Sequence, residues 1–280
     1  MVFQQIRLAI SAAEYESVCE TLEHLGALSI TLMDAEDNPI FEPEPGMQPL
    51  WENAIVLALF DEKADLKNYA VEIIEDKNWE RECMDQFHPM RFGEKLWICP
   101  SWHKINEPDA IIVDLDPGLA FGTGSHATTK LCLTWLATHN LQNKILIDYG
   151  TGSGILAISA MKLGAKKAYA VDIDTQALQA VEENALNNKV ELEISTPEHL
   201  SVIQADIIIA NILANPLIDL APLLLSHLKQ NGQLVLSGIL VSQMDDVKHA
   251  YEPAINFDTP VVEDDWVRLS GTHSSGIITP

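Results

Sequence analysis

The sequence predicts an α/β protein with a doubly wound parallel sheet, preceded by a small α+β domain. Three apolar runs predict the sheet, because each has the pattern of a buried strand and ends on a polar residue. The carboxyl ends of parallel strands open onto loops, so these polar ends indicate a cofactor crevice. The runs 145–148, 168–172 and 206–211 end on Asp148, Asp172 and Asn211, and glycines 150, 152 and 154 follow the first of them.

The spacing of these glycines favours S-adenosylmethionine over a dinucleotide as the cofactor. A dinucleotide loop usually reads Gly-x-Gly-x-x-Gly and brings a helix N-terminus onto a pyrophosphate. Here the third glycine stands one residue early, at Gly154, and Asp148 would be an awkward neighbour for a phosphate. S-adenosylmethionine has no phosphate, and its ribose diol suits a carboxylate such as Asp172. The loop resembles the class I methyltransferase signature; a glycine-rich turn with structural duties only is the alternative interpretation.

The composition indicates a globular protein with substantial cores. The chain has 280 residues, 47% of them hydrophobic, which is enough for two domains. It lacks an apolar run of about eighteen residues that could span a membrane. Its N-terminus lacks the basic-then-apolar pattern of a secretion signal. Four scattered cysteines without a Cys-x-x-Cys pattern predict reduced thiols and no zinc site. We therefore expect a cytoplasmic protein without a metal.

The charge of the chain is strongly acidic. Seventeen basic residues against 41 acidic ones give a net charge of −24. Residues 1–60 contain ten acidic residues and a single basic one, Arg7. Such a chain repels phosphate backbones, which disfavours direct nucleic-acid readout, and it attracts a cationic partner. Acidity that serves only solubility is the other interpretation of the same charge.

Residues 1–78 are expected to form the α+β domain, which we interpret as a substrate-recognition domain. An acidic, proline-rich loop is expected at 34–49. The order of elements, strand-helix-strand-strand-helix, suggests a ferredoxin-like sandwich. The expected strands are 3–10, 27–33 and 54–60, and the expected helices are 12–25 and 64–78.

A connector rich in aromatic residues and proline is expected at 79–110. Tryptophan and phenylalanine recur through it, and Pro89, Pro100 and Pro108 interrupt it. Because aromatic side chains are usually buried, we favour a segment packed by its aromatic residues over a peptide-binding groove.

Residues 111–280 are expected to form the Rossmann-like domain, because strands and helices alternate through them. Such alternation predicts a parallel sheet with right-handed crossovers. The segments 255–258 and 266–270 are expected to add antiparallel edge strands. The expected parallel strands are 145–148, 168–172, 190–194, 205–210 and 233–237, and the expected helices are 128–139, 153–163, 175–187, 213–230 and 242–251.

Several segments together resemble one family of methyltransferases. The most specific is Asp116-Pro-Gly-Leu-Ala-Phe-Gly-Thr-Gly-Ser-His-Ala-Thr-Thr-Lys130, which is too rich in glycine and hydroxyl groups for a core element. Together with the glycine loop and four further segments, it resembles the PrmA family, bacterial methyltransferases of the eleventh protein of the large ribosomal subunit. The four segments are Phe92-Gly-Glu-Lys-Leu-Trp-Ile-Cys-Pro-Ser-Trp102, Val171-Asp-Ile-Asp174, Asn211-Ile-Leu-Ala-Asn-Pro-Leu217 and Leu236-Ser-Gly-Ile-Leu240. The resemblance covers nearly the whole chain. It implies a class I (Rossmann-like) S-adenosylmethionine-dependent methyltransferase domain preceded by a ferredoxin-like substrate-recognition domain.

The resemblance also implies which residues bind the cofactor. Asp172 would hold the ribose diol, and Thr129 would offer a hydroxyl to the methionine end. Asn211 stands where related N-methyltransferases begin an Asn/Asp-Pro-Pro-Tyr motif, and would orient the cofactor and the amine. The structural alternatives are a helix start for Thr129 and a strand-end cap for Asn211. The expected cofactor-binding residues are Thr129, Gly150, Gly152, Asp172 and Asn211, with no metal ligand and no residue assigned as catalytic base.

His126 is the candidate for a general base. Methyl transfer from a sulfonium needs only a neutral amine in line with the methyl group, so positioning should dominate. We therefore expect His126 to order its loop.

The expected function is that of a monomeric protein N-methyltransferase acting on lysine and/or N-terminal amines of a basic ribosomal protein. Methylation of a nucleobase is disfavoured, because a nucleobase methyltransferase needs an aromatic side chain that stacks on the flipped base. Here Asn211 is followed by Ile212, Leu213 and Ala214. An RNA or small-molecule methyltransferase on the same fold, and a non-catalytic protein that only binds the cofactor, are the alternatives.

Overall fold

The computed structural model describes residues 2–36, 50–75, 87–116 and 124–274. The chain divides into two compact units, residues 1–82 and residues 83–280. Each unit has a sheet and a hydrophobic core of its own. In these ranges no helix is long and apolar enough to cross a membrane.

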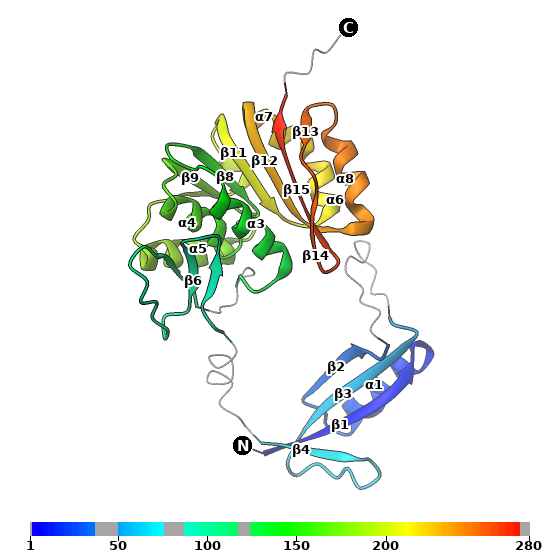
Figure 1. The fold of residues 1–280 in the computed structure, drawn as a ribbon. Helices are drawn as coiled ribbons and strands as arrows, with labels where there is room; N and C mark the ends of the chain where they lie inside the picture. The colour runs from blue at the N-terminus through cyan, green and yellow to red at the C-terminus, as the bar shows by residue number, and fades with distance from the viewer. Residues whose placement is uncertain (1, 37–49, 76–86, 117–123, 275–280) are drawn as a thin grey trace. The chain divides into compact units, whose positions relative to one another are not determined.

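The smaller unit is a four-stranded antiparallel sheet with one face covered by a helix (Figure 1). Its strand order is β2-β3-β1-β4, and β1 pairs with both β3 and β4. The helix α1 buries Leu22 in a core shared with Ile6, Val56 and Phe60. The elements are β1 (Val2–Ser11), the short helix η1 (Ala12–Glu14), α1 (Tyr15–His24), β2 (Ser29–Asp34), β3 (Asn53–Asp61) and β4 (Val71–Glu75).

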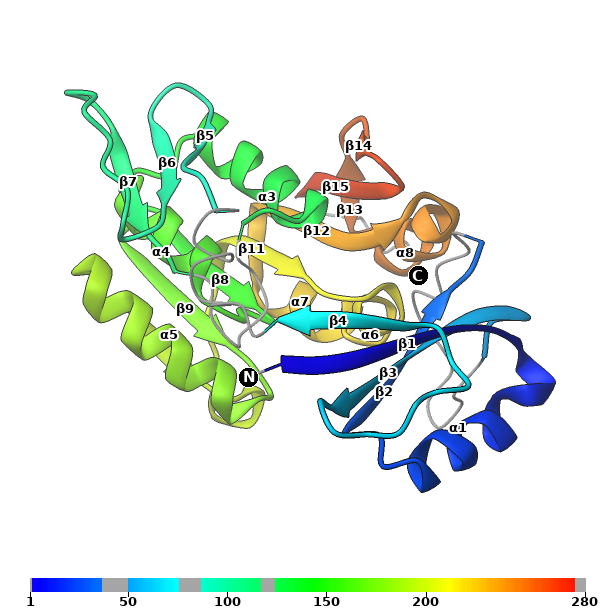
Figure 2. The same cartoon turned by 90° about the horizontal axis from the view of Figure 1, so that it is seen from below.

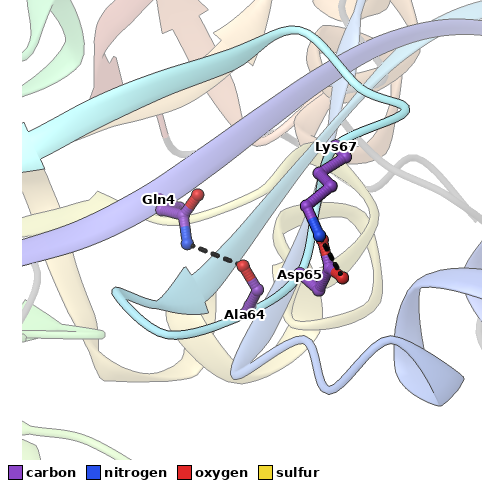
Figure 3. Close-up of polar contacts among 4 residues, drawn as sticks. All are labelled: Gln4, Ala64, Asp65 and Lys67. Carbon is purple, nitrogen blue, oxygen red and sulfur yellow. Dashed lines mark hydrogen bonds and ion pairs between the residues drawn. The ribbon is translucent and has the colours of Figure 1, made fainter.

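The helix expected at 64–78 is wrong over its described part. Residues 62–70 form turns, and β4 follows them. The amide Nε2 of Gln4 donates hydrogen bonds to the carbonyl oxygens of Asp61, Glu62 and Ala64, at 3.2, 3.0 and 3.1 Å. Figure 3 shows the bond to Ala64, with the exposed Asp65–Lys67 ion pair beside it. The bond to Ala64 occupies a carbonyl group that a helix starting there would need, and β4 pairs with β1 instead, so tertiary pairing overrides helix propensity.

The larger unit is built on an eight-stranded sheet with the order β10-β9-β8-β11-β12-β15-β13, to which β14 adds by pairing with β15. The five strands from β10 to β12 are parallel, and β15 runs antiparallel to β12, β13 and β14. The expected parallel sheet with antiparallel additions is thus confirmed, but β15, expected as an edge strand, lies between β12 and β13. The strands are β8 (Ile145–Tyr149), β9 (Lys167–Val171), β10 (Glu193–Ser195), β11 (Ala205–Asn211), β12 (Leu228–Leu240), β13 (Ile255–Phe257), β14 (Val261–Glu263) and β15 (Trp266–His273).

Helices cover both faces of this sheet (Figures 1 and 2). Two separate hydrophobic clusters fill the space beneath them, one on each face. The single helix expected at 213–230 is two short helices, because Pro222 stands in the first turn of a second helix that begins at Ala221, and β12 starts already at Leu228. On one face lie α3 (Ala127–Thr138), α4 (Ile155–Lys162) and α5 (Thr175–Asn188); on the other lie α6 (Ala214–Asp219), α7 (Ala221–His227) and α8 (Met244–Tyr251), with the short helices η2 (Pro197–His199) and η3 (Val241–Gln243) in the connections.

A further three-stranded sheet packs on the α3 and α4 side of the larger unit. It consists of β5 (Met90–Phe92), β6 (Leu96–Cys99) and β7 (Ile111–Asp114). Its buried side chains join the same cluster as α3 and α4. The side chain of Asn188 in α5 binds the backbone of β7 at Asp114. Its Oδ1 accepts the N–H of Asp114 at 2.8 Å, and its Nδ2 donates to the carbonyl oxygen of Asp114 at 2.7 Å. Of the stretch expected as a connector, β5 and β6 therefore belong to the larger unit, and Phe92, Leu96 and Ile98 are buried in its core.

Candidate functional site

The order of the strands places a ligand crevice at the C-terminal ends of β8 and β11. The chain runs outward from β8 through β9 to β10, and then returns to the other side of β8 with β11. Such a reversal leaves an opening between the two neighbouring strands. A cavity of about 570 Å³ lies there, within the usual range for small-molecule sites. Its polar lining comes from His126, Thr128, Asp172 and Asn211, and its apolar lining from Tyr149, Ile173, Ile212, Leu213, Pro216, Leu220 and Trp266.

The glycine loop folds tightly against β9 and against Ile212. The backbone N–H groups of Gly150 and Thr151 donate to the carbonyl of Val171, at 2.8 and 3.0 Å. Gly150, Gly152 and Gly154 all have positive φ, at 74°, 54° and 80°. A Cβ atom on Gly150 would lie 2.2 Å from Cγ2 of Ile212. Position 150 therefore has no room for a side chain.

Asp172 stands at the end of β9 with its carboxylate held by two backbone groups. Its Oδ2 accepts a hydrogen bond from Gly152 N at 2.9 Å, and its Oδ1 accepts one from Asp174 N at 3.0 Å. A carboxylate has about four acceptor positions, so two remain for a ligand. Asp172 lines the cavity. The arrangement suits a pair of hydroxyl donors, as in a ribose diol.

Asp148 is an internal anchor of the loop. It is fully buried and is not among the cavity-lining residues. Its Oδ2 accepts hydrogen bonds from Thr151 Oγ1 at 2.7 Å and from Ala157 N at 3.1 Å, and so ties the loop to the first turn of α4. Burial raises the pKa of Asp148 to about 7, against the lowering effect of these two bonds.

Asn211 and Thr129 are brought together from β11 and α3. Asn211 lines the cavity, and its Nδ2 donates to Oγ1 of Thr129 at 3.3 Å. Thr129 is fully buried and does not itself line the cavity. Within the described residues, Thr129 therefore reaches the site through Asn211.

His126 caps α3 and packs on Trp266. Its Nδ1 accepts the backbone N–H of Thr128 at 3.3 Å and lies 2.8 Å from the hydroxyl of the same residue. Its ring meets Trp266 edge-on, with 5.1 Å between the ring centroids. These contacts agree with a role in ordering the loop. Part of the glycine- and hydroxyl-rich segment before it, residues 117–123, lies outside the described ranges.

Sequence reasoning missed most of the apolar wall. Gly238, at the end of β12, has φ of 84°, and a Cβ atom there would lie 2.3 Å from the carbonyl oxygen of Ile212. Trp266 was expected only as part of an edge strand. Gly238 could have been identified, because it lies in the segment Leu236–Leu240, which resembles the PrmA family. The sequence around Trp266 contains no pattern that indicates a cavity residue.

Together, the sheet and the cavity define a class of protein: the S-adenosylmethionine-dependent methyltransferases with a class I, Rossmann-like fold. Residues 2–274 match the family model described as "Ribosomal protein L11 methyltransferase (PrmA)". The chain belongs to this family.

Its similarity to named relatives extends over almost the full length. It is 48% identical to proteins named "Ribosomal protein L11 methyltransferase" from Glaesserella parasuis and Pseudomonas putida, and in each case the alignment covers 97% of this chain and 99% of the relative. The crystal structure of a ribosomal protein L11 methylase from Lactobacillus delbrueckii subsp. bulgaricus is also similar. That chain is 37% identical, with a TM-score of 0.60, and the match covers 67% of this chain and all of the other.

Proposed function

We propose that this protein transfers methyl groups from S-adenosylmethionine to lysine and/or N-terminal amines of ribosomal protein L11. The observation that carries the proposal is one cavity with Asp172 at one strand end, Asn211 at another and an apolar wall beside them. The names of the relatives support the same substrate.

The residues of the cavity fit S-adenosylmethionine. Asp172 has acceptor positions left for the ribose hydroxyls, and Gly152 holds its carboxylate in place. The exposed side chain of Ile173 lies beside it as an apolar surface for the adenine ring. When bound, the cofactor supplies a methyl group on a positively charged sulfur, which an amine nitrogen can attack directly.

Asn211 is suited to position the amine. Its Nδ2 is engaged by Thr129, so the side chain is fixed and its Oδ1 remains an acceptor for an N–H of the incoming amine. A fixed acceptor that aligns the nitrogen lone pair with the methyl group supplies positioning, the main requirement of this reaction.

The apolar wall assists the loss of the amine proton. A lysine has an ordinary pKa of about 10.4 and must be neutral to attack. An apolar surrounding disfavours the ammonium form and lowers its pKa. Leu213, Pro216 and Trp266 supply such a surrounding.

The smaller unit is proposed to recruit the substrate. The exposed face of α1 carries Glu16, Glu20 and Glu23, and a basic ribosomal protein would be attracted to it. The same acidity argues against direct nucleic-acid readout. We further propose that the enzyme works as a cytoplasmic monomer.

The test is methyl transfer from labelled S-adenosylmethionine into purified ribosomal protein L11, with ribosomal RNA in a parallel reaction. Label in the protein is expected with the wild type and a strongly reduced signal with Asn211→Ala. Label in the RNA alone would overturn the choice of substrate, and label in neither would overturn the proposed activity.

Recruitment is tested with the triple variant E16Q/E20Q/E23Q in the full chain. A higher KM for L11, with unchanged affinity for S-adenosylmethionine, is expected if α1 attracts the substrate. An unchanged KM would remove that role from α1.

A further inference from the structure

The β14–β15 hairpin stands at the edge of the cavity. Its turn, Asp264-Asp265, joins Glu263 to Trp266, which pair across the hairpin, and Trp266 lines the cavity. Trp266 also pairs with Leu240, so the turn lies at the same end of the sheet as the crevice. Figure 2 shows the hairpin in red beside the end of α3.

The hairpin and the adjoining η3 expose apolar side chains. Val261, Val262 and Val241 are 39%, 52% and 46% exposed. Val241 is held next to the turn, because its backbone N–H donates to the carbonyl of Asp265 at 3.0 Å. Val261 and Val262 point to opposite faces of β14, which among the described strands pairs only with β15, so the outer edge of this strand exposes both. We call this edge, with Val241, Asp264 and Asp265, the hairpin surface.

The hairpin surface also carries negative charge that is not neutralised locally. Asp264 and Asp265 are exposed, and within the described ranges neither has an ion-pair partner. The carboxylate of the neighbouring Glu263 lies 3.8 Å from the ammonium group of Lys130 in α3. This ion pair connects the hairpin to α3, and the hydrogen bond from Val241 to Asp265 connects it to η3. The two carboxylates are thus presented on a braced turn.

We propose that the hairpin surface docks the basic segment that flanks the acceptor amine of the substrate protein. This inference rests on the proposed function and names where that function meets its substrate. Exposed valines next to carboxylates fit the aliphatic stems and charged ends of lysine and arginine side chains. The surface is continuous with the cavity through Trp266, so a segment bound there has its amine at the entrance. A second copy of this chain, with its net charge of −24, would meet like charge there.

The first test is the variant D264N/D265N, which removes two charges and keeps the shape of the turn. Its matched control is E182Q/E183Q on α5, which removes two exposed charges far along the chain from the hairpin. Steady-state methylation of L11 is measured at low and moderate salt. We expect the KM of D264N/D265N to rise roughly tenfold at low salt and to depend less on salt, with kcat and cofactor affinity within about twofold. The control should match the wild type.

The second test is V261T/V262T, which keeps branched side chains suited to a strand and removes apolar contact. We expect its KM for L11 to rise by roughly fivefold, while its KM for a short lysine peptide without flanking basic residues stays unchanged. If the wild type methylates L11 and both variants keep its KM, the docking surface is wrong and the proposed function stands. If the wild type does not methylate L11, both fall.

Discussion

Replacing Gly150 by alanine tests the geometry of the glycine loop most directly. The new Cβ atom would lie 2.2 Å from Cγ2 of Ile212, and ordinary contact begins near 3.4 Å, so Ile212 must withdraw by about 1.2 Å. The backbone at position 150 also has φ of 74°, in the left-handed region. That conformation costs alanine about 1–2 kcal/mol, and pushing Ile212 off its rotamer costs about 0.5–1.5 kcal/mol.

The backbone strain at position 150 and the displacement of Ile212 affect protein stability and cofactor affinity differently. The backbone cost is the same with and without cofactor, so it lowers stability only. Ile212 lines the cavity, so its displacement also acts on cofactor affinity. The sum, roughly 1.5–3.5 kcal/mol, should lower the melting temperature by roughly 3–14 °C. The strain itself is present with and without cofactor, but an Ile212 side chain moved by about 1.2 Å also loses contacts with the bound cofactor, so S-adenosylmethionine binding should weaken by roughly twofold or more.

The assay combines calorimetric titration of S-adenosylmethionine with thermal unfolding, in a double-mutant cycle. Ile212→Ala removes the clashing methyl group, so in G150A/I212A only the backbone cost should remain. The affinity lost in G150A should then be largely absent from the double variant relative to I212A. Wild-type affinity in G150A, or no coupling between the two positions, would refute the steric argument.

Three further outcomes are expected. Asp172→Asn should weaken S-adenosylmethionine binding by roughly tenfold or more in calorimetry, whereas Asp174→Asn, which alters the nearby cap of α5, should leave it unchanged; equal effects would contradict the diol assignment. Thr129→Val should lower kcat by roughly tenfold with little change in cofactor affinity or melting temperature, because Asn211 loses its 3.3 Å bond; an unchanged kcat would remove the positioning role. Because burial raises the pKa of Asp148 from 3.8 to about 7, the native state keeps a proton that the unfolded state loses, so stability should fall as pH rises through this window. Urea unfolding of Asp148→Asn should show a flatter pH dependence, and an identical slope would contradict it.

The sheet of the larger unit was predictable because its strands are buried on both faces. The runs that became β8, β9 and β11 are continuously apolar and end on polar residues, a pattern that few other structures produce. The same pattern predicts four residues of the cavity, because each stands at or just after the end of a strand of that sheet. They are Gly150, Gly152, Asp172 and Asn211. The local sequence was enough to place them at one edge.

Features that depend on distant partners were not predictable. The helix expected at 64–78 failed because Gln4, about 60 residues earlier, occupies the carbonyl groups of the turn. Trp266 reaches the cavity only because β15 inserts between β12 and β13. The close approach of Gly238 to Ile212 joins two different strand ends. No local pattern encodes such pairings.

The division into two units has a thermodynamic consequence for cofactor binding. Among the residues that the structure describes, all that line the cavity belong to the unit of residues 83–280. Ligand binding adds free energy to the native state of that unit, about 2.7 kcal/mol at a hundredfold excess over Kd. S-adenosylmethionine therefore acts as a selective probe in calorimetry. If it shifts one melting transition and leaves a second in place, the two units unfold independently; if the whole chain melts later as one transition, folding of the smaller unit is energetically linked to the occupied cavity.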